Sequence, residues 1–236
     1  MAARDSLVNE QVPDMIALLK RIMDKLEKQP INLTIKDFKA RRMVTIPIGK
    51  FGIQLILRLD AGDSNDFIYF PALLYGIEQG DYRLLQKYAE RRYNQFNGVY
   101  GSGISAMREA SGATQKRYEQ IAKEGKIALL GNAMNTPDLY AGWGNIDLGD
   151  EFRGQVESNI RTLFISGTMD SNTPSSNVEE LEKGLSRSKH LIIQNAGHED
   201  MLPNRQVQEQ IISFIRKETT SDIPITLPKP RFIAVF

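Results

Sequence analysis

The sequence contains no cysteine and only two histidines, and both shortages exclude kinds of chemistry. Without cysteine, the 236 residues can form no disulfide, no thiolate metal site and no thiol nucleophile. The two histidines have no carboxylates at the spacing of a metal centre, so a zinc site of the usual kind is not expected. We therefore expect a protein that works without a metal or any other cofactor.

The chain also lacks an excess of charge and any long apolar run. Lys and Arg number 30 and Asp and Glu number 29, giving a net charge of +1, so no strong field would attract nucleic acid or an anionic membrane. The longest apolar runs, "IQLIL" and "FPALLYGI", are far shorter than the roughly 20 residues that cross a bilayer. We expect neither a nucleic acid nor a membrane as a partner. No secretory leader is visible near Met1, and the compartment stays open.

The first part of the chain, about residues 1–155, reads as mainly helical with one small hairpin. The segment Pro13–Lys28 places apolar residues three and four positions apart, with Pro13 expected in the first turn of a helix. "INLTIKDFKARRMVTIPIG" alternates apolar and polar residues around a charged connection, which predicts a hairpin. Glycines punctuate the later helical patterns. The predicted helices cover residues 51–59, 67–78, 81–96 and 115–123.

The second part, residues 156–236, changes to a pattern of strand, helix, strand and helix. "RTLFISG" is a continuous apolar run, as expected of a parallel strand that is buried on both faces. "SSNVEELEKGL" predicts a helix, "KHLIIQNAG" a second strand and "RQVQEQIISFIRKE" a last helix. A connection of this length between two strands implies a right-handed parallel crossover. The fold class is therefore α/β.

Each predicted strand of the second part is followed by one residue that can take part in catalysis. Asp170 follows the first strand in "LFISGTMDSNTP", and His198 follows the second in "LIIQNAGHED". An aspartate and then a histidine in this order fit the last two members of the Ser…Asp…His triad of α/β-hydrolases. Taken singly, Asp170 has an alternative as a turn residue and His198 as a cap before the last helix. As a pair at consecutive strand ends, they favour the catalytic interpretation.

The same residues carry a family resemblance. "TLFISGTMDSNTP", "HLIIQNAGHED" and "ITLPKPRF" resemble the C-terminal segment of α/β-hydrolases of the prolyl and tripeptidyl aminopeptidase-like group. Upstream, "LLGNAMNTPDLYAGWGNIDLGDEFRGQVESNI" and "QVPDMIALLKRIMDKLEKQPINLTI" resemble parts of the helical cap of these enzymes. The resemblance implies a cap over residues 1–155, then the last part of a hydrolase core. It also implies serine-dependent cleavage of a peptide or a small amide or ester, with Asp170 and His198 in the triad.

Two departures from the family pattern set limits on this interpretation. Many relatives carry cysteines near the positions of Ala110 and Ala141, so here the cap would be held by packing alone. No G-x-S-x-G motif occurs, and neither Ser102 nor Ser105 has glycines at the required positions. We expect the nucleophilic serine, the first strands and the oxyanion loop upstream of this chain. On its own the chain is predicted to be inactive.

Other possibilities remain open at this stage. Tyr140 and Trp143 are candidates for lining a substrate pocket, although packing within the cap is the favoured alternative. The runner-up for function is a truncated, inactive relative that acts as a binding or interaction module. If the strand before Asp170 lacks a neighbour on one edge, its unpaired backbone groups can pair with another chain. Self-association through this edge is therefore expected.

Overall fold

The computed structural model describes residues 5–99, 107, 110–133, 147–217 and 224–233, which form two compact units. Unit 1 comprises Met1–Leu59, Tyr69–Gly154 and Phe232–Phe236, and unit 2 comprises Asp60–Ile68 and Gln155–Arg231. The main division between the two units falls between Gly154 and Gln155. Residues 60–68, which the sequence pattern assigns to the helical part, group with unit 2.

Unit 1 begins with two helices, α1 (Ser6–Gln11) and α2 (Met15–Lys28). The side chain of Asp14 accepts a hydrogen bond from the backbone N–H of Ala17 at 2.8 Å and so caps α2. Pro13 therefore precedes the cap and lies outside the helix, whereas the sequence pattern predicts it in the first turn. The apolar stripe of α2 is buried from Leu18 to Leu26 as its spacing requires, whereas Ile16 in the first turn is exposed. Helix α1 was not predicted, because six residues are too few to show a helical period.

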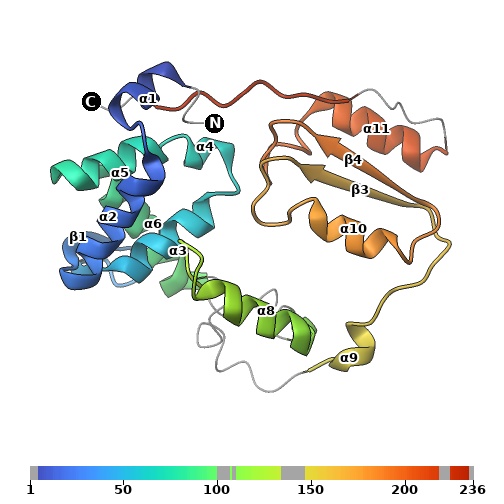
Figure 1. Cartoon of the computed structure of the whole chain (residues 1–236), viewed down its shortest axis with the longest axis horizontal. Coiled ribbons are helices and arrows are strands. Elements are labelled where there is room, and N and C mark those ends of the chain that lie inside the picture. Colours follow the sequence, from blue (N-terminus) through green and yellow to red (C-terminus); the bar gives the residue numbers. More distant parts are fainter. Residues whose placement is uncertain (1–4, 100–106, 108–109, 134–146, 218–223, 234–236) are drawn as a thin grey trace. The chain divides into compact units, whose positions relative to one another are not determined.

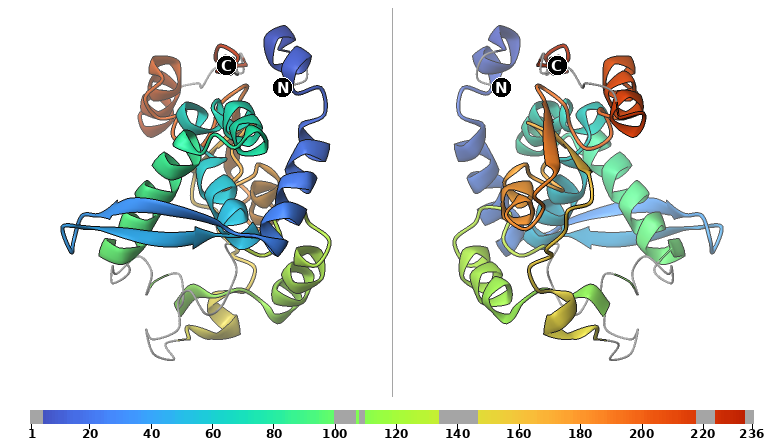
Figure 2. Two further views of the ribbon diagram at one scale, coloured as in Figure 1. Left: turned by 90° about the vertical axis from the view of Figure 1, so that its left-hand side faces the viewer. Right: turned by 90° about the vertical axis from the view of Figure 1, so that its right-hand side faces the viewer.

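The predicted hairpin is confirmed by strands β1 (Ile31–Asp37) and β2 (Arg42–Ile48). The two strands are antiparallel, with Ile31 opposite Ile48 and Asp37 opposite Arg42. Alternate residues of β1 are buried, as expected of a strand with one face on the core. Helix α6 (Arg83–Val99) packs against β1, as Figure 2 shows.

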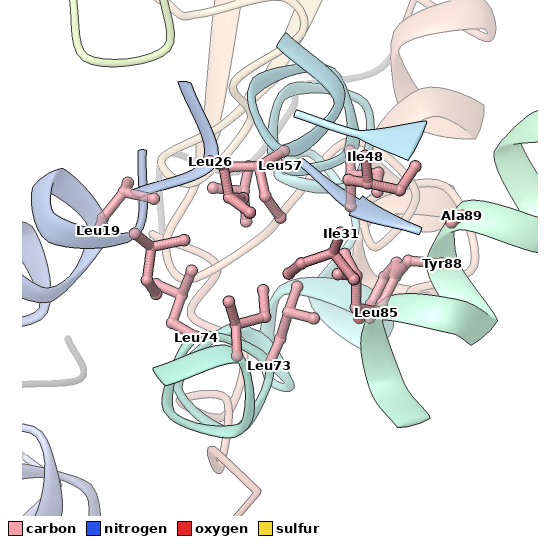
Figure 3. Close-up of a cluster of buried hydrophobic side chains, with 14 of the residues drawn as sticks. Leu19, Leu26, Ile31, Ile48, Leu57, Leu73, Leu74, Leu85, Tyr88 and Ala89 are labelled. Atoms are coloured by element: carbon pink, nitrogen blue, oxygen red, sulfur yellow. The ribbon is translucent and has the colours of Figure 1, made fainter. Parts of the chain in front are cut away.

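Helices supply most of the core of unit 1. Besides α2 and α6, they include α3 (Lys50–Asp60) and α5 (Phe70–Gln79). Unit 1 also contains α8 (Gln115–Gly125) and the four-residue α9 (Gly149–Phe152), neither of which buries a residue. Helices α3, α5, α6 and α8 lie close to the predicted ranges. Apolar side chains from α2, α3, α5, α6 and the hairpin meet in one cluster (Figure 3). Labelled members are Leu19, Leu26, Ile31, Ile48, Leu57, Leu73, Leu74, Leu85, Tyr88 and Ala89.

Unit 2 contains the predicted strand–helix–strand motif. Strand β3 (Thr162–Gly167) lies parallel to β4 (Ser188–Ile193), and α10 (Ser176–Glu182) connects them. Helix α11 (Arg205–Ile215) follows, and in Figure 1 the two helices lie on opposite sides of the strand pair. The α/β prediction and its parallel crossover are confirmed.

The two strands of unit 2 differ in their outer neighbours. Beyond the end of β4, Gln194 forms a parallel bridge with Thr226, so the C-terminal segment runs beside this strand. Within the described residues, β3 pairs with β4 alone. Among the residues that the structure describes in both units, no helix is long and apolar enough to cross a bilayer.

Candidate active site

Two turns at one edge of the parallel pair carry the candidate residues. Because parallel strands end at the same edge, the turns after β3 and β4 lie side by side. The backbone N–H of Met169 donates to the carbonyl of Ala196 at 2.9 Å, which ties the turns together. A Cβ on Gly167 would lie 2.2 Å from that same carbonyl oxygen, so this close approach requires glycine.

Asp170 and His198 are in direct contact at this edge. Oδ2 of Asp170 lies 2.9 Å from Nδ1 of His198, within the hydrogen-bond distance expected for a triad pair. The Asp170 side chain is fully buried, whereas 39% of the His198 side chain is exposed. The contact thus combines a carboxylate shielded from water with an imidazole that is partly open to solvent.

Asp170 accepts further hydrogen bonds from its own turn. The backbone N–H groups of Asn172 and Thr173 donate to Oδ1 at 2.8 and 2.9 Å, and the Thr173 hydroxyl donates to Oδ2 at 2.7 Å. Burial raises the pKa of Asp170, but the hydrogen bonds from Thr173, His198 and Asn172 together outweigh it and lower the pKa below the ordinary value. Asp170 is therefore ionised at neutral pH. Sequence reasoning gave Thr173 no role, although its position three residues after an aspartate suits such a turn.

The ionised partner fixes the tautomer of His198. A carboxylate only accepts hydrogen bonds, so the proton lies on Nδ1 of the ring. The lone pair of Nε2 then remains available to accept a proton. An imidazole held in this way, with Nε2 unprotonated, can act as a general base.

The backbone of the His198 turn is held by a distant segment. The N–H of His198 donates to the carbonyl of Gly62 at 2.6 Å. The carboxylate of Asp200 accepts from the N–H of Gly197 at 2.7 Å and from the Ser64 hydroxyl at 2.6 Å. Sequence reasoning missed these contacts, since residues 136 positions apart leave no periodic signal.

The remaining sequence-based candidates are not brought to this edge. Tyr140 and Trp143, like Ser102 and Ser105, lie outside the described residues. In the described part of the chain, no serine hydroxyl is hydrogen-bonded to the His198 ring, and no group of three His, Asp or Glu side chains could hold a metal ion.

The second unit thus contains a parallel strand–helix–strand motif with an Asp–His pair at its carboxyl edge. Residues 135–224 match the family model described as TAP-like protein, and both Asp170 and His198 lie in this range. The match supports the predicted relationship to the TAP-like α/β-hydrolases. No curated protein and no solved structure matches the chain.

Proposed function

We propose that this chain carries the aspartate and the histidine of the catalytic triad of a serine hydrolase. The enzyme would cleave a peptide or a small amide or ester. The observation that carries the proposal is the 2.9 Å contact between Asp170 and His198, with the carboxylate buried and the ring exposed. The family match supports it at the level of a hydrolase. In this proposal, residues 1–155 correspond to a cap and residues 156–236 to the last part of the core.

The proposed mechanism follows from the charges of the pair. His198 accepts the proton of a serine nucleophile at Nε2 and returns it to the leaving group, acting first as base and then as acid. Asp170 holds the Nδ1–H tautomer and stabilises the imidazolium that forms between these steps. The donors on Asp170 keep it anionic throughout, because each of them favours the charged form.

The serine itself is not assigned to a described residue. No serine of the chain lies in a G-x-S-x-G turn, which is why we expect the chain alone to show no triad-type hydrolysis. A fluorophosphonate probe tests this directly, because it labels only an activated serine. We expect no label. A labelled serine that depends on His198 would overturn the predicted inactivity and would identify the nucleophile.

The acid–base pair is testable without the serine. An exposed imidazole with a free Nε2 attacks p-nitrophenyl acetate, releasing p-nitrophenol and forming an acyl-imidazole. We expect His198 to account for this release, so that His198→Gln removes it and the matched control His190→Gln does not. Asp170→Asn should slow the release by about tenfold or more, because the amide favours the other tautomer. Equal reactivity in wild type and Asp170→Asn would disprove the proposal.

A second candidate function is an interaction module that associates with a copy of itself. The free edge of β3 favours it, since among the described residues only β4 pairs with this apolar strand. Light scattering over a range of concentrations tests this proposal. Association that is abolished by Ile165→Pro, with the secondary structure of the variant intact, supports edge pairing, and a monomer at every concentration disproves it.

A further inference from the structure

The segment formed by residues 60–68 contacts both turns of the candidate active site. It joins two helices of unit 1 in sequence, yet it packs within unit 2. Its Gly62 carbonyl accepts the N–H of His198 at 2.6 Å. A Cβ on Gly62 would lie 2.6 Å from Nδ2 of Asn172, in the turn that carries Asp170. The 60–68 segment therefore lies against the backbone of His198 and against Asn172, which is two residues after Asp170.

A second link joins the 60–68 segment to the His198 turn. The Asp200 carboxylate accepts the Ser64 hydroxyl on Oδ1 at 2.6 Å and the Gly197 N–H on Oδ2 at 2.7 Å. Hydrogen bonds to an ionised carboxylate are stronger than those between neutral groups. The Asp200 carboxylate binds the N–H of Gly197, and the Gly62 carbonyl binds the N–H of His198. Two consecutive backbone N–H groups are therefore held in place.

The 60–68 segment is fixed internally as well. It includes α4 (Ser64–Phe67), whose N-cap Asp63 accepts the N–H of Asn65 at 2.8 Å. Phe67 at the end of this short helix is buried, with 9% of its surface exposed, which also restrains the segment. Because the segment is capped and restrained, its contacts at Gly62 and Ser64 can impose a position on the His198 turn rather than follow it.

We propose that the 60–68 segment is a positioning element that holds His198 in register with Asp170. This inference rests on the proposed function, because the orientation of the ring matters for proton transfer. The ring is 39% exposed, and its hydrogen-bond partners among the described residues all lie on the Nδ1 side, so its direction depends on the backbone that carries it. Small displacements of a catalytic group cost large factors in rate. Ser64 and Asp200 act through His198 and are positioning residues.

Ser64 is not assigned as the nucleophile, although it lies in this network. Its hydroxyl donates to a carboxylate that is already bound to a backbone N–H, and it has no hydrogen bond to the His198 ring. An Asp acceptor without an imidazole does not provide the base of a triad. A fluorophosphonate adduct on Ser64 would overturn the positioning role.

The test compares paired variants of the full chain. Ser64→Ala removes one end of the bridge, and Ser176→Ala, an exposed serine of unit 2, is its matched control. Asp200→Asn weakens the other end, and Glu199→Gln removes the same charge from the exposed neighbour. Ser64→Thr keeps the hydroxyl and should restore what Ser64→Ala loses.

The readouts concern the ring and the backbone of His198. With two histidines in the chain, long-range nitrogen–proton spectra separate the two rings once each is assigned by its Gln variant. We expect Ser64→Ala and Asp200→Asn to lower the fraction of His198 protonated at Nδ1. We also expect amide exchange at His198 to speed up by about tenfold, as the loss of one hydrogen bond implies. His190 should remain unchanged, as should both controls.

The outcomes separate this inference from the proposed function. If Asp170→Asn slows p-nitrophenol release while Ser64→Ala and Asp200→Asn leave the His198 ring and amide unchanged, the positioning role is wrong and the acid–base pair stands. If Asp170→Asn has no effect, the proposed function is wrong whatever the segment does. If Glu199→Gln changes the His198 ring and amide as strongly as Asp200→Asn does, the change comes from the loss of any nearby negative charge. The positioning role is then overturned.

Discussion

The two units each contain one buried aspartate at or just beyond the end of a strand. Asp37 ends β1 in unit 1 and is 3% exposed, and Asp170 follows β3 in unit 2 and is 5% exposed. Both accept backbone N–H and hydroxyl groups. Asp37 accepts from Ala40 N–H at 2.8 Å and Tyr93 Oη at 3.1 Å. In each case the donors satisfy an ionised carboxylate, so burial alone does not distinguish the two sites.

The pKa shifts do not distinguish them either. The Ala40 N–H, with smaller help from Tyr93, Lys39 and Arg42, holds the pKa of Asp37 below its ordinary value against the effect of burial. For Asp170, burial is the largest single influence and raises the pKa, but its hydrogen bonds together lower it. Both carboxylates are therefore anionic at neutral pH.

The difference lies in one side-chain partner of each carboxylate, Asn97 for Asp37 and His198 for Asp170. Asp37 accepts from the amide of Asn97 at 3.2 Å, which can neither gain nor lose a proton near neutral pH. Asp170 faces the imidazole of His198, which can do both. A buried aspartate with a lowered pKa thus marks a candidate catalytic site only when it holds an exposed group that can transfer a proton.

The largest effects should come from removing either carboxylate, and they should be alike in the two units. Asp170→Ala leaves the donors of Asn172, Thr173 and His198 without an acceptor, which costs about 3 kcal/mol. For a chain of this size, that lowers the Tm by roughly 6–12 °C. Asp37→Ala should lower the Tm of unit 1 comparably, as calorimetry with separate fits for two transitions would show. If Asp170→Ala left the Tm unchanged, the hydrogen-bond network of Asp170 would be absent in solution.

Removing one side-chain partner of each carboxylate, Tyr93 of Asp37 or His198 of Asp170, should separate the two sites. Tyr93→Phe deletes a hydrogen bond to a charged acceptor in unit 1 and should lower the Tm by roughly 3–5 °C. His198→Gln removes a partly exposed side chain and should lower the Tm by less than about 2 °C, because Asp170 keeps its hydrogen bonds from Asn172 and Thr173. If His198→Gln proves the more destabilising change, the ring is a structural element and the comparison fails.

The features that could be predicted from sequence are those with a local period or a topological cause. The hairpin and the helix stripes follow from alternation and three- or four-residue spacing. The Asp170–His198 contact follows from topology, because parallel strands deliver their following turns to one edge. The Asp37 network joins residues 56 and 60 positions apart, and the Ser64–Asp200 bridge joins residues 136 apart. Such contacts depend on how distant elements pack, and no pattern along the chain records them.

A third, smaller effect concerns acid. Because both pKa values are lowered in the folded chain, each carboxylate contributes stability that is complete above its unfolded pKa of about 4. This contribution is lost as the pH falls through the lower folded pKa. Asp37→Asn and Asp170→Asn should each lower the Tm by about 3 °C at pH 6, with the gap to wild type closing toward pH 2. A gap that instead widens in acid would reverse the assigned direction of the shift.

The smallest effect should come from the other histidine, which also contacts a serine. His190 Nε2 lies 2.9 Å from the Ser166 hydroxyl, and its ring meets the ring of Phe164 edge-on, with centroids 6.3 Å apart. Ser166 is 2% exposed inside β3, so a substrate cannot reach its hydroxyl, and we interpret the pair as a structural link between the strands. Ser166→Ala should cost about 1 kcal/mol, which lowers the Tm by roughly 2–4 °C. It should leave the reaction of His198 with p-nitrophenyl acetate unchanged, because Asp170 holds that ring independently. A fluorophosphonate adduct on Ser166, lost in His190→Gln, would instead place the reactive serine in the middle of the sheet and reverse the roles of the two histidines.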